Sequence, residues 1–200
     1  MTVGRPRKDA NREDTTLRLL RAAEQHFGAH GYRDARLGDI AAEAGIRRSS
    51  LLYHFNTKEQ LHAAVVERAF GELSEAIAGS VSAGEGTLAE RVEGVARGLL
   101  AFADERPALV TIVLRELVDT SSAGQALVAR NLNDLVGRLE AAVLAWSDPA
   151  PGAKAFPVRA AILQVMSSYL VRVASGEVGT MLWGAEDHTL TLARALLARD

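Results

Sequence analysis

The sequence predicts an all-α protein, with a small three-helix head at the N-terminus and a longer helical body behind it. Three observations predict this fold class. Apolar residues recur at spacings of three and four along most of the chain, which is the period of an amphipathic helix. Glycines, prolines and helix-capping pairs separate these segments from one another. The chain also lacks the alternating apolar and polar runs that would predict strands.

Residues 37 to 58 contain two short helical patterns that meet at Gly45. A glycine suits that place because the residue after a helix end often needs a positive φ, which glycine adopts without steric cost. Two short helices joined by a tight turn predict a helix-turn-helix, whose second helix enters the DNA major groove. The apolar anchors of the two helices are Leu37, Ile40, Ala41 and Ala44, followed by Ile46, Leu51 and Phe55.

The second of these helices is polar on its other side, with side chains that donate hydrogen bonds to phosphates and base edges. An ordinary helical hairpin with a solvated face would explain the apolar spacing as well. It would not explain the succession of a polar turn, a Tyr-His-Phe cluster and a lysine in the first turn of the next helix, where a phosphate would suit that cation. The candidate DNA-binding residues are Arg36, Leu37, Arg47, Arg48, Ser49, Ser50, Tyr53, His54 and Lys58.

On these residues the chain resembles the TetR family of bacterial transcriptional regulators, over about residues 15 to 65. The sequence departs from the family pattern in three places. Arg36 stands where a hydroxyl residue usually opens the first helix, and Arg47 stands where a small capping residue usually opens the second. Leu52 stands where the family has a tyrosine, and Tyr53 follows one residue later. These departures alter the expected base contacts but keep the apolar anchors. By the same resemblance, Lys58 contacts the DNA backbone.

The charge distribution supports a DNA-binding head. The net charge is −2 for the whole chain, which alone would argue against a nucleic-acid partner. Residues 1 to 58, however, hold 11 Lys and Arg against 7 Asp and Glu, whereas residues 59 to 200 hold 12 against 18. A basic surplus confined to one end of the chain is expected of a DNA-binding head on a body that does not touch DNA.

Composition argues against catalysis. The chain has no cysteine, which excludes disulfides, thiolate catalysis and Cys-ligated zinc. His26 and His30 lie one helical turn apart but lack a third ligand, so we expect no metal, and we expect neither a cofactor nor an enzyme. The N-terminus lacks the apolar core of a signal peptide, and no apolar run is long enough to span a membrane. We therefore expect a cytoplasmic bacterial protein that joins the nucleoid through its operator.

We divide the chain into a basic flexible arm at residues 1–12, a helix-turn-helix domain at 13–58 and a regulatory and dimerisation domain at 59–200. The arm can reach a minor groove or remain a solvated tail. Residues 79–86 are predicted as a linker because they hold three glycines. Other predicted boundaries are capping boxes at Thr57–Gln60, Thr87–Glu90 and Ser122–Gln125, a helix start at Pro107 and a loop at 147–157.

The predicted helix from 158 to 174 is apolar on two sides, which carry Ile162 and Val165 on one and Leu163, Met166 and Leu170 on the other. A helix apolar on both sides must be buried on both. We therefore expect this helix and the last segment, 190–197, to meet a second subunit. By the TetR resemblance these two helices form a four-helix interface in a homodimer, whose two heads read a pseudo-palindromic operator.

The same resemblance implies that a small-molecule effector enters the body, changes the spacing of the heads and releases DNA. A repressor is the expected form; an activator, a ligand-independent regulator and a helical protein–protein adaptor are the alternatives. Aromatic residues with few charges nearby favour an apolar or aromatic effector, although each could be an ordinary core residue. The candidate ligand-binding residues are Phe102, Val113, Arg115, Asn131, Leu135, Trp146, Gln164, Tyr169 and Trp183.

Overall fold

The computed structural model describes residues 8–82, 86–119, 122, 124–147 and 157–198. Within these ranges the chain forms ten helices and no strand, so the predicted all-α fold is confirmed. The helices are α1 (Lys8–Asp34), α2 (Leu37–Glu43), α3 (Arg48–His54), α4 (Lys58–Ser82), α5 (Leu88–Glu105), α6 (Pro107–Val118), α7 (Gln125–Trp146), α8 (Val158–Ala174), α9 (Gly176–Trp183) and α10 (Thr189–Leu197).

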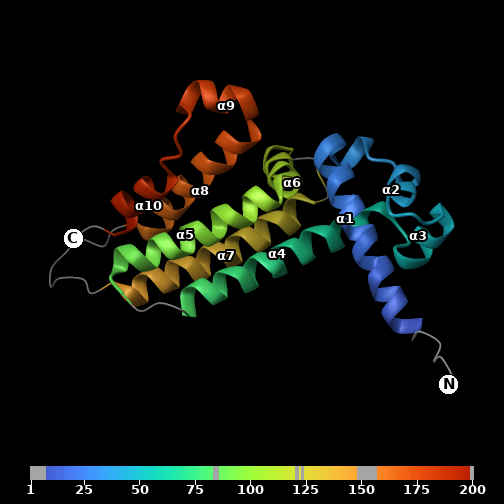
Figure 1. Cartoon of the computed structure of the whole chain (residues 1–200), viewed down its shortest axis with the longest axis horizontal. Helices are drawn as coiled ribbons and strands as arrows, with labels where there is room; N and C mark the ends of the chain where they lie inside the picture. The colour runs from blue at the N-terminus through green and yellow to red at the C-terminus, as the bar shows by residue number, and fades with distance from the viewer. Residues whose placement is uncertain (1–7, 83–85, 120–121, 123, 148–156, 199–200) are drawn as a thin grey trace, which may run out of the picture.

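The head consists of α1, α2 and α3, which gather at one end of the molecule (Figure 1). The predicted anchors Ile40, Ala41, Ala44 and Leu51 are buried in its core. Gly45 has a φ of 70°, which confirms the reason for a glycine between the two short helices. The head therefore follows from its apolar spacing and one turn glycine.

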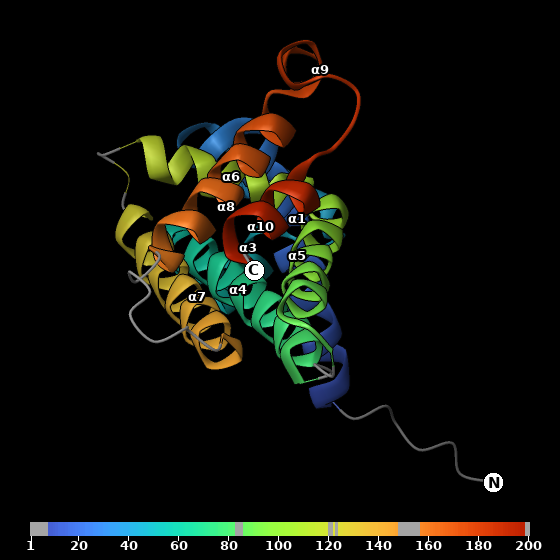
Figure 2. The same ribbon diagram turned by 90° about the vertical axis from the view of Figure 1, so that its left-hand side faces the viewer.

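The body is built on three long helices, α4, α5 and α7, which run along the long axis of the molecule (Figure 1). Helix α4 begins beside α3 and continues into the body. Helices α8 and α10 pack on this layer, and α9 projects from α8 (Figure 2). Helix α6 lies at the junction, where it contacts α1 of the head. The body therefore contacts the head through α4 and α6.

At the junction, α1 and α6 meet backbone to backbone at Gly28. A Cβ atom placed on Gly28 would lie 2.7 Å from the Cβ of Ala108 and 2.8 Å from its Cα. Real side chains do not approach so closely, so any larger residue at position 28 would push the two helices apart. The head and the body are therefore in direct contact at this point.

Two of the predicted helix starts are confirmed. Thr87 Oγ1 accepts a hydrogen bond from the backbone N–H of Glu90 at 3.3 Å, and the Glu90 carboxylate accepts one from the N–H of Thr87 at 2.8 Å. This is the reciprocal pairing of a capping box. Pro107 occupies the first turn of α6, where its missing N–H costs nothing.

The other two predicted capping boxes differ from the structure. Thr57 Oγ1 accepts from the N–H of Gln60 at 3.2 Å, but the Gln60 side chain accepts from Asn56, one residue before the expected partner. The box at Ser122 is wrong, because α7 begins at Gln125 with Gly124 as its N-cap. The Ser122 hydroxyl accepts a hydrogen bond from the N–H of Gly124 at 3.2 Å instead.

Two expected non-helical stretches are partly helical. Residues 8–12, expected within the flexible arm, belong to α1, which can begin there because Pro6 lies outside it; residues 1–7 lie outside the described residues. Residues 79–82 of the expected linker are the end of α4, since one glycine in a helix costs only about 1 kcal/mol. Most of the predicted loop, 148–156, also lies outside the described residues.

Helix α8 is not buried on both sides. Val165 and Ile162 are buried as expected, but on the other stripe Met166 turns towards the body, whereas Leu163 is 48% exposed. The expected second stripe is therefore split: Met166 faces the interior of the body, and Leu163 faces solvent. Among the described helices, none combines the length and the apolar character that a membrane span needs.

Candidate nucleic-acid interface and ligand cavity

The polar side of α3 faces away from the protein. The helix begins at Arg48, and the arginine before it is an N-cap with extended backbone and no side-chain hydrogen bond to the helix. Residues 47–50 are exposed, and Tyr53 is 72% exposed. Ser49 and Tyr53 are one turn apart and lie opposite the buried Leu51. They therefore form the outermost line of the helix, with Arg48 beside them.

The structure shows where the residues that depart from the family pattern lie in the head. Leu52 is half-buried and packs against the core of the head, so it cannot present the surface that a tyrosine would. The aromatic ring has moved to Tyr53, about 100° further around the helix. Arg36 is the exposed N-cap of α2 without a side-chain cap, and Leu37 is partly buried against the core.

Two of the candidate DNA-binding side chains also have partners inside the protein. His54 Nδ1 lies 3.4 Å from the hydroxyl of Thr16 on α1. Lys58 Nζ donates to the carbonyl of Arg33 at 2.9 Å and lies 4.9 Å from the centre of the Tyr32 ring. The carbonyl at the end of α1 thus satisfies a lysine whose position in the first turn of α4 had suggested a phosphate.

At the corner between α5 and α6, Arg106 joins three helices. Its guanidinium donates to both carboxylate oxygens of the buried Glu24 on α1, with Nε 2.7 Å from Oε1, and also to Glu72 on α4. Burial raises the pKa of Glu72, but hydrogen bonds from Arg106 and Arg68 outweigh it and hold that pKa below its usual value. Arg106 also lies 5.5 Å from the centre of the Phe102 ring. We call Arg106, Glu24 and Glu72 the Arg106 clamp.

A second buried polar pair joins α4 to α6. His62 Nε2 lies 3.3 Å from Glu116 Oε1, and both side chains are almost fully buried. Burial lowers the pKa of His62 below its ordinary value of 6.5, although the charge of Glu116 opposes this. Among the residues that the structure describes, Glu116 Oε2 has no hydrogen-bond partner. Gly124 covers the pair so closely that a Cβ there would lie 2.6 Å from this oxygen. Unlike the Arg106 clamp, this pair is only half satisfied.

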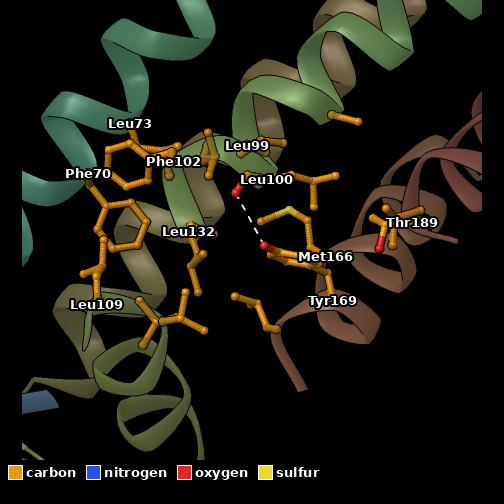
Figure 3. A pocket seen from close by; sticks show the side chains of 17 residues that line it. Phe70, Leu73, Leu99, Leu100, Phe102, Leu109, Leu132, Met166, Tyr169 and Thr189 are labelled. Atoms are coloured by element: carbon orange, nitrogen blue, oxygen red, sulfur yellow. Dashed lines mark hydrogen bonds between the residues drawn. The ribbon is translucent and has the colours of Figure 1, made fainter. Parts of the chain in front are cut away.

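The body contains a partly open apolar cavity of about 100 Å³ between α4, α5, α6, α7, α8 and the start of α10. Phe70 and Phe102 lie on one side of it, and Met166 and Tyr169 face them from the other (Figure 3). The side-chain oxygens in its lining belong to Tyr169 and Thr189, and none of the lining residues is charged. The Tyr169 hydroxyl donates to Asp104 Oδ1 at 2.7 Å.

A smaller apolar cavity, of about 50 Å³, lies next to the first between α5, α7, α8 and α10. Trp146 forms part of its wall and has the guanidinium of Arg91 5.8 Å from its ring centre. The residues that line both cavities are Ala96, Leu99, Val165 and Met166.

Five of the nine candidate ligand-binding residues line these cavities. Phe102, Val113, Leu135 and Tyr169 line the first cavity, and Trp146 lines the second. These are the apolar and aromatic candidates from α5, α6, α7 and α8, and they lie there because their helical stripes face the body.

The other four candidates lie outside both cavities, which corrects their expected role. Arg115 points towards α1, where it donates to the carbonyls of residues 27 and 29 and lines an open cleft at the junction. Asn131 donates to the carbonyl of Leu127 one turn earlier. Gln164 is exposed, and Trp183 lies on the projecting α9 with 38% of its surface exposed. The polar candidates fail because helix backbone and solvent satisfy them.

The cavity residues that sequence reasoning missed are ordinary members of apolar stripes. No residue type distinguishes a cavity wall from a packed core, because both need apolar side chains at helical spacing. The only available signal was their presence on those stripes. Among them are Phe70, Leu73, Leu99, Leu109, Leu132 and Met166.

Comparison with known proteins finds the strongest sequence similarity in the head. The family model described as bacterial regulatory proteins, tetR family, matches residues 19–65, which run from α1 through α3 into α4. The head of the chain therefore matches the TetR family of bacterial regulatory proteins. The chain is 40% identical over 57 residues to the HTH-type transcriptional regulator SrpR of Pseudomonas putida, a match that spans 28% of this chain and 27% of SrpR.

Other similarities support the same assignment. The HTH-type transcriptional regulator TtgR, also of Pseudomonas putida, is 34% identical over 65 residues, which are 32% of this chain and 30% of TtgR. The structure of FadR from Bacillus subtilis in complex with stearoyl-CoA superposes with a TM-score of 0.69 at 15% identity, covering 91% of this chain and 95% of FadR. The fold of FadR therefore extends over the body of this chain, whereas the sequence similarity to SrpR and TtgR spans less than a third of the length of either relative.

Proposed function

We propose that the protein is a DNA-binding transcriptional regulator that reads its operator with α3. The observation that carries this proposal is the exposed polar line of α3 on a head whose sequence matches TetR-family regulators. Arg48 lies at the start of the helix, from which an arginine can pair with O6 and N7 of a guanine. Ser49, Ser50 and Tyr53 lie beside it, and Arg36, Arg47 and Lys58 supply positive charge for phosphates.

We further propose that the protein acts as a homodimer, so that two heads read the two halves of a pseudo-palindromic site. Exposed apolar side chains support this proposal: Leu163 and Val171 on α8, and Val178, Met181 and Leu182 on α9. The apolar side of α10 packs on α5 and α8 instead, so α8 and α9 replace α8 and α10 as the expected interface. Light scattering should show a dimer at micromolar concentration, and a monomer would contradict the proposal.

The third part of the proposal is that an apolar effector binds in the body and weakens operator binding. The cavity beside Phe102 and Tyr169 supports it, as does the ligand of the similar FadR structure. A ligand that prefers the DNA-free conformation must lower operator affinity by the same factor by which DNA lowers ligand affinity. Repression with release is the form we propose. Reporter expression that falls when the gene is deleted would identify an activator.

The proposal is tested by binding the full-length protein to genomic fragments and then to a library of variants of the selected operator. Arg48→Ala should cost about 1–3 kcal/mol on the operator and relax the preference at one base pair in each half-site. Lys58→Ala should weaken binding to all sequences alike and reduce the log–log salt slope by roughly one.

A control separates DNA contact from structural support, because Lys58 also bonds Arg33. The melting temperature of each variant without DNA shows whether the head remains folded. If Arg47→Ala and Arg48→Ala both lose affinity uniformly, these arginines bind phosphates, and base reading passes to Ser49, Ser50 and Tyr53. If no genomic fragment binds, the head is not a DNA reader, and the rival interpretation as a protein–protein adaptor gains.

A further inference from the structure

We propose that the two cavities of the body form a single site for an unbranched aliphatic alcohol, with Met166 and Leu99 as the gate between its two halves. This rests on the proposed ligand response and names the chemical class of the ligand. The arrangement consists of two adjacent apolar cavities, a flexible partition and two hydroxyl oxygens whose protons are already donated elsewhere.

The partition between the cavities is thin. Two residues of α5 and two of α8 line both cavities, and of these Ala96 and Val165 are too short to close a passage. Leu99 and Met166 are the long ones, and both are half-buried with empty space on either side. Leu99 and Met166 are therefore the two long side chains in the shared wall between the space beside Phe102 and the space beside Trp146.

The gate can open at low cost. Methionine is unbranched, has three rotatable bonds and fills irregular gaps readily. A rotation of Met166 into one of its other staggered conformers requires no movement of the backbone. The opened space runs across α5 and α8 and is bounded by mostly apolar walls on α4, α5, α6, α7, α8 and α10. A long narrow chain fits such a space, whereas a compact ring system would occupy one cavity only.

The polar atoms of the lining select the end group of the ligand. The hydroxyl of Tyr169 donates its proton to Asp104 at 2.7 Å, and the hydroxyl of Thr189 donates its proton to Asp187 at 2.6 Å. Each oxygen can still accept a hydrogen bond. The ligand must therefore supply a donor, as an alcohol does. A carboxylate has no proton to give and would lie close to Asp104, with no cation in the lining. Asp187 is already paired with Arg172, so that arginine is not free to bind a carboxylate.

The proposal is tested by calorimetric titration of the full-length protein with hexanol, octanol, decanol and dodecanol, in the absence of DNA. Each added methylene should tighten binding about fourfold, as burial of a methylene predicts, until the chain fills both cavities. Dodecanoate should bind at least tenfold more weakly than dodecanol. Cyclododecanol, with the same number of carbons in a ring, should also bind more weakly.

Substitution of the gate gives the decisive comparison. Met166→Trp should fill the passage, so that hexanol binds as it does to the wild type while longer alcohols gain nothing. Leu144→Trp, on the exposed side of α7, is the matched control and should leave the whole series unchanged. Leu99→Phe blocks the passage from α5 and serves as the second variant, should Met166→Trp not fold.

Three results would overturn the proposal: a chain-length series that either gate variant leaves unchanged, dodecanoate binding as tightly as dodecanol, or tighter binding of the ring alcohol. These results are independent of DNA. If the alcohols bind as described but leave operator affinity unchanged, the chain-shaped site stands and the proposed release mechanism fails.

Discussion

The head and the body differ in how completely their apolar side chains are packed. In the head, Leu19, Phe27, Ile40 and Leu51 are at most 1% exposed, and neither apolar cavity is lined by α2 or α3. In the body, apolar side chains of the same kinds surround two cavities, and several, such as Leu132, are only half-buried. The difference indicates that the head presents a fixed surface, whereas the body keeps space that a ligand can fill.

Two buried polar contacts near the junction of head and body also differ. The Arg106 clamp pairs its guanidinium with two carboxylates, one on α1 and one on α4. The pair of His62 and Glu116 joins two body helices, and among the described residues one oxygen of Glu116 has no hydrogen-bond partner. The first contact holds the head to the body, whereas the second is the weaker contact and lies within the body, between α4 and α6.

The largest expected effect tests the packing of the head directly. Leu51→Ala removes a fully buried anchor and should lower the free energy of unfolding by about 2–5 kcal/mol. Leu132→Ala should fall at or below the lower end of that range, because its side chain already faces empty space. Leu144→Ala, at a site 55% exposed, is the control and should change stability by no more than about 0.5 kcal/mol.

Denaturant unfolding of the three variants gives these free energies. Equal losses for Leu51→Ala and Leu132→Ala would show that the body is packed as tightly as the head. The contrast between the two regions would then be lost.

A second, smaller effect concerns the clamp. Glu24→Gln removes the negative charge that faces Arg106. It should lower the free energy of unfolding by about 1.5–3 kcal/mol, the range for a hydrogen bond to a charged group. Glu140→Gln breaks a half-exposed pair with Arg159 and should cost less than about 1 kcal/mol. Hydrogen exchange should locate the loss for Glu24→Gln in α1 and α4. Exchange that rises only near α5 would contradict a role in holding the head.

The smallest expected effect is a pH dependence at the weaker contact. Because burial lowers the pKa of His62, the unfolded chain takes up a proton below pH 6.5 that the folded chain refuses. The contribution of His62 to the free energy of unfolding is therefore fully present above that pH. It declines as the pH falls towards the lowered pKa of the folded state. His62→Gln removes this part of the decline. Unfolding free energies measured for both proteins from about pH 8 to about pH 5 should converge in acid, and a constant difference would contradict the assignment.

The sequence predicts the head better than the body, for physical reasons. Helix spacing and the positive φ of Gly45 are local properties, so the anchors and the turn could be found without coordinates. The clamp joins Arg106 to Glu24, which lie 82 residues apart, and no local pattern records that distance. The partner of Lys58 was missed because it is a backbone carbonyl, which leaves no trace in residue type.

The cavities were beyond prediction for a related reason. Apolar spacing predicts which side of a helix turns inward, and it found Phe102 and Tyr169 correctly as inward-facing residues. It does not say whether the inward side meets another side chain or empty space. That outcome depends on the distances between helices, which arise only when the whole body is assembled.

The contact between Gly28 and Ala108 has a mechanical consequence. Between most packed helices a layer of side chains can rotate and absorb small movements, but here the two backbones touch. Packed atoms have low compressibility, so α6 cannot move towards α1 at this point without moving α1 as well. The close approach at Gly28 therefore couples the position of the head directly to that of α6.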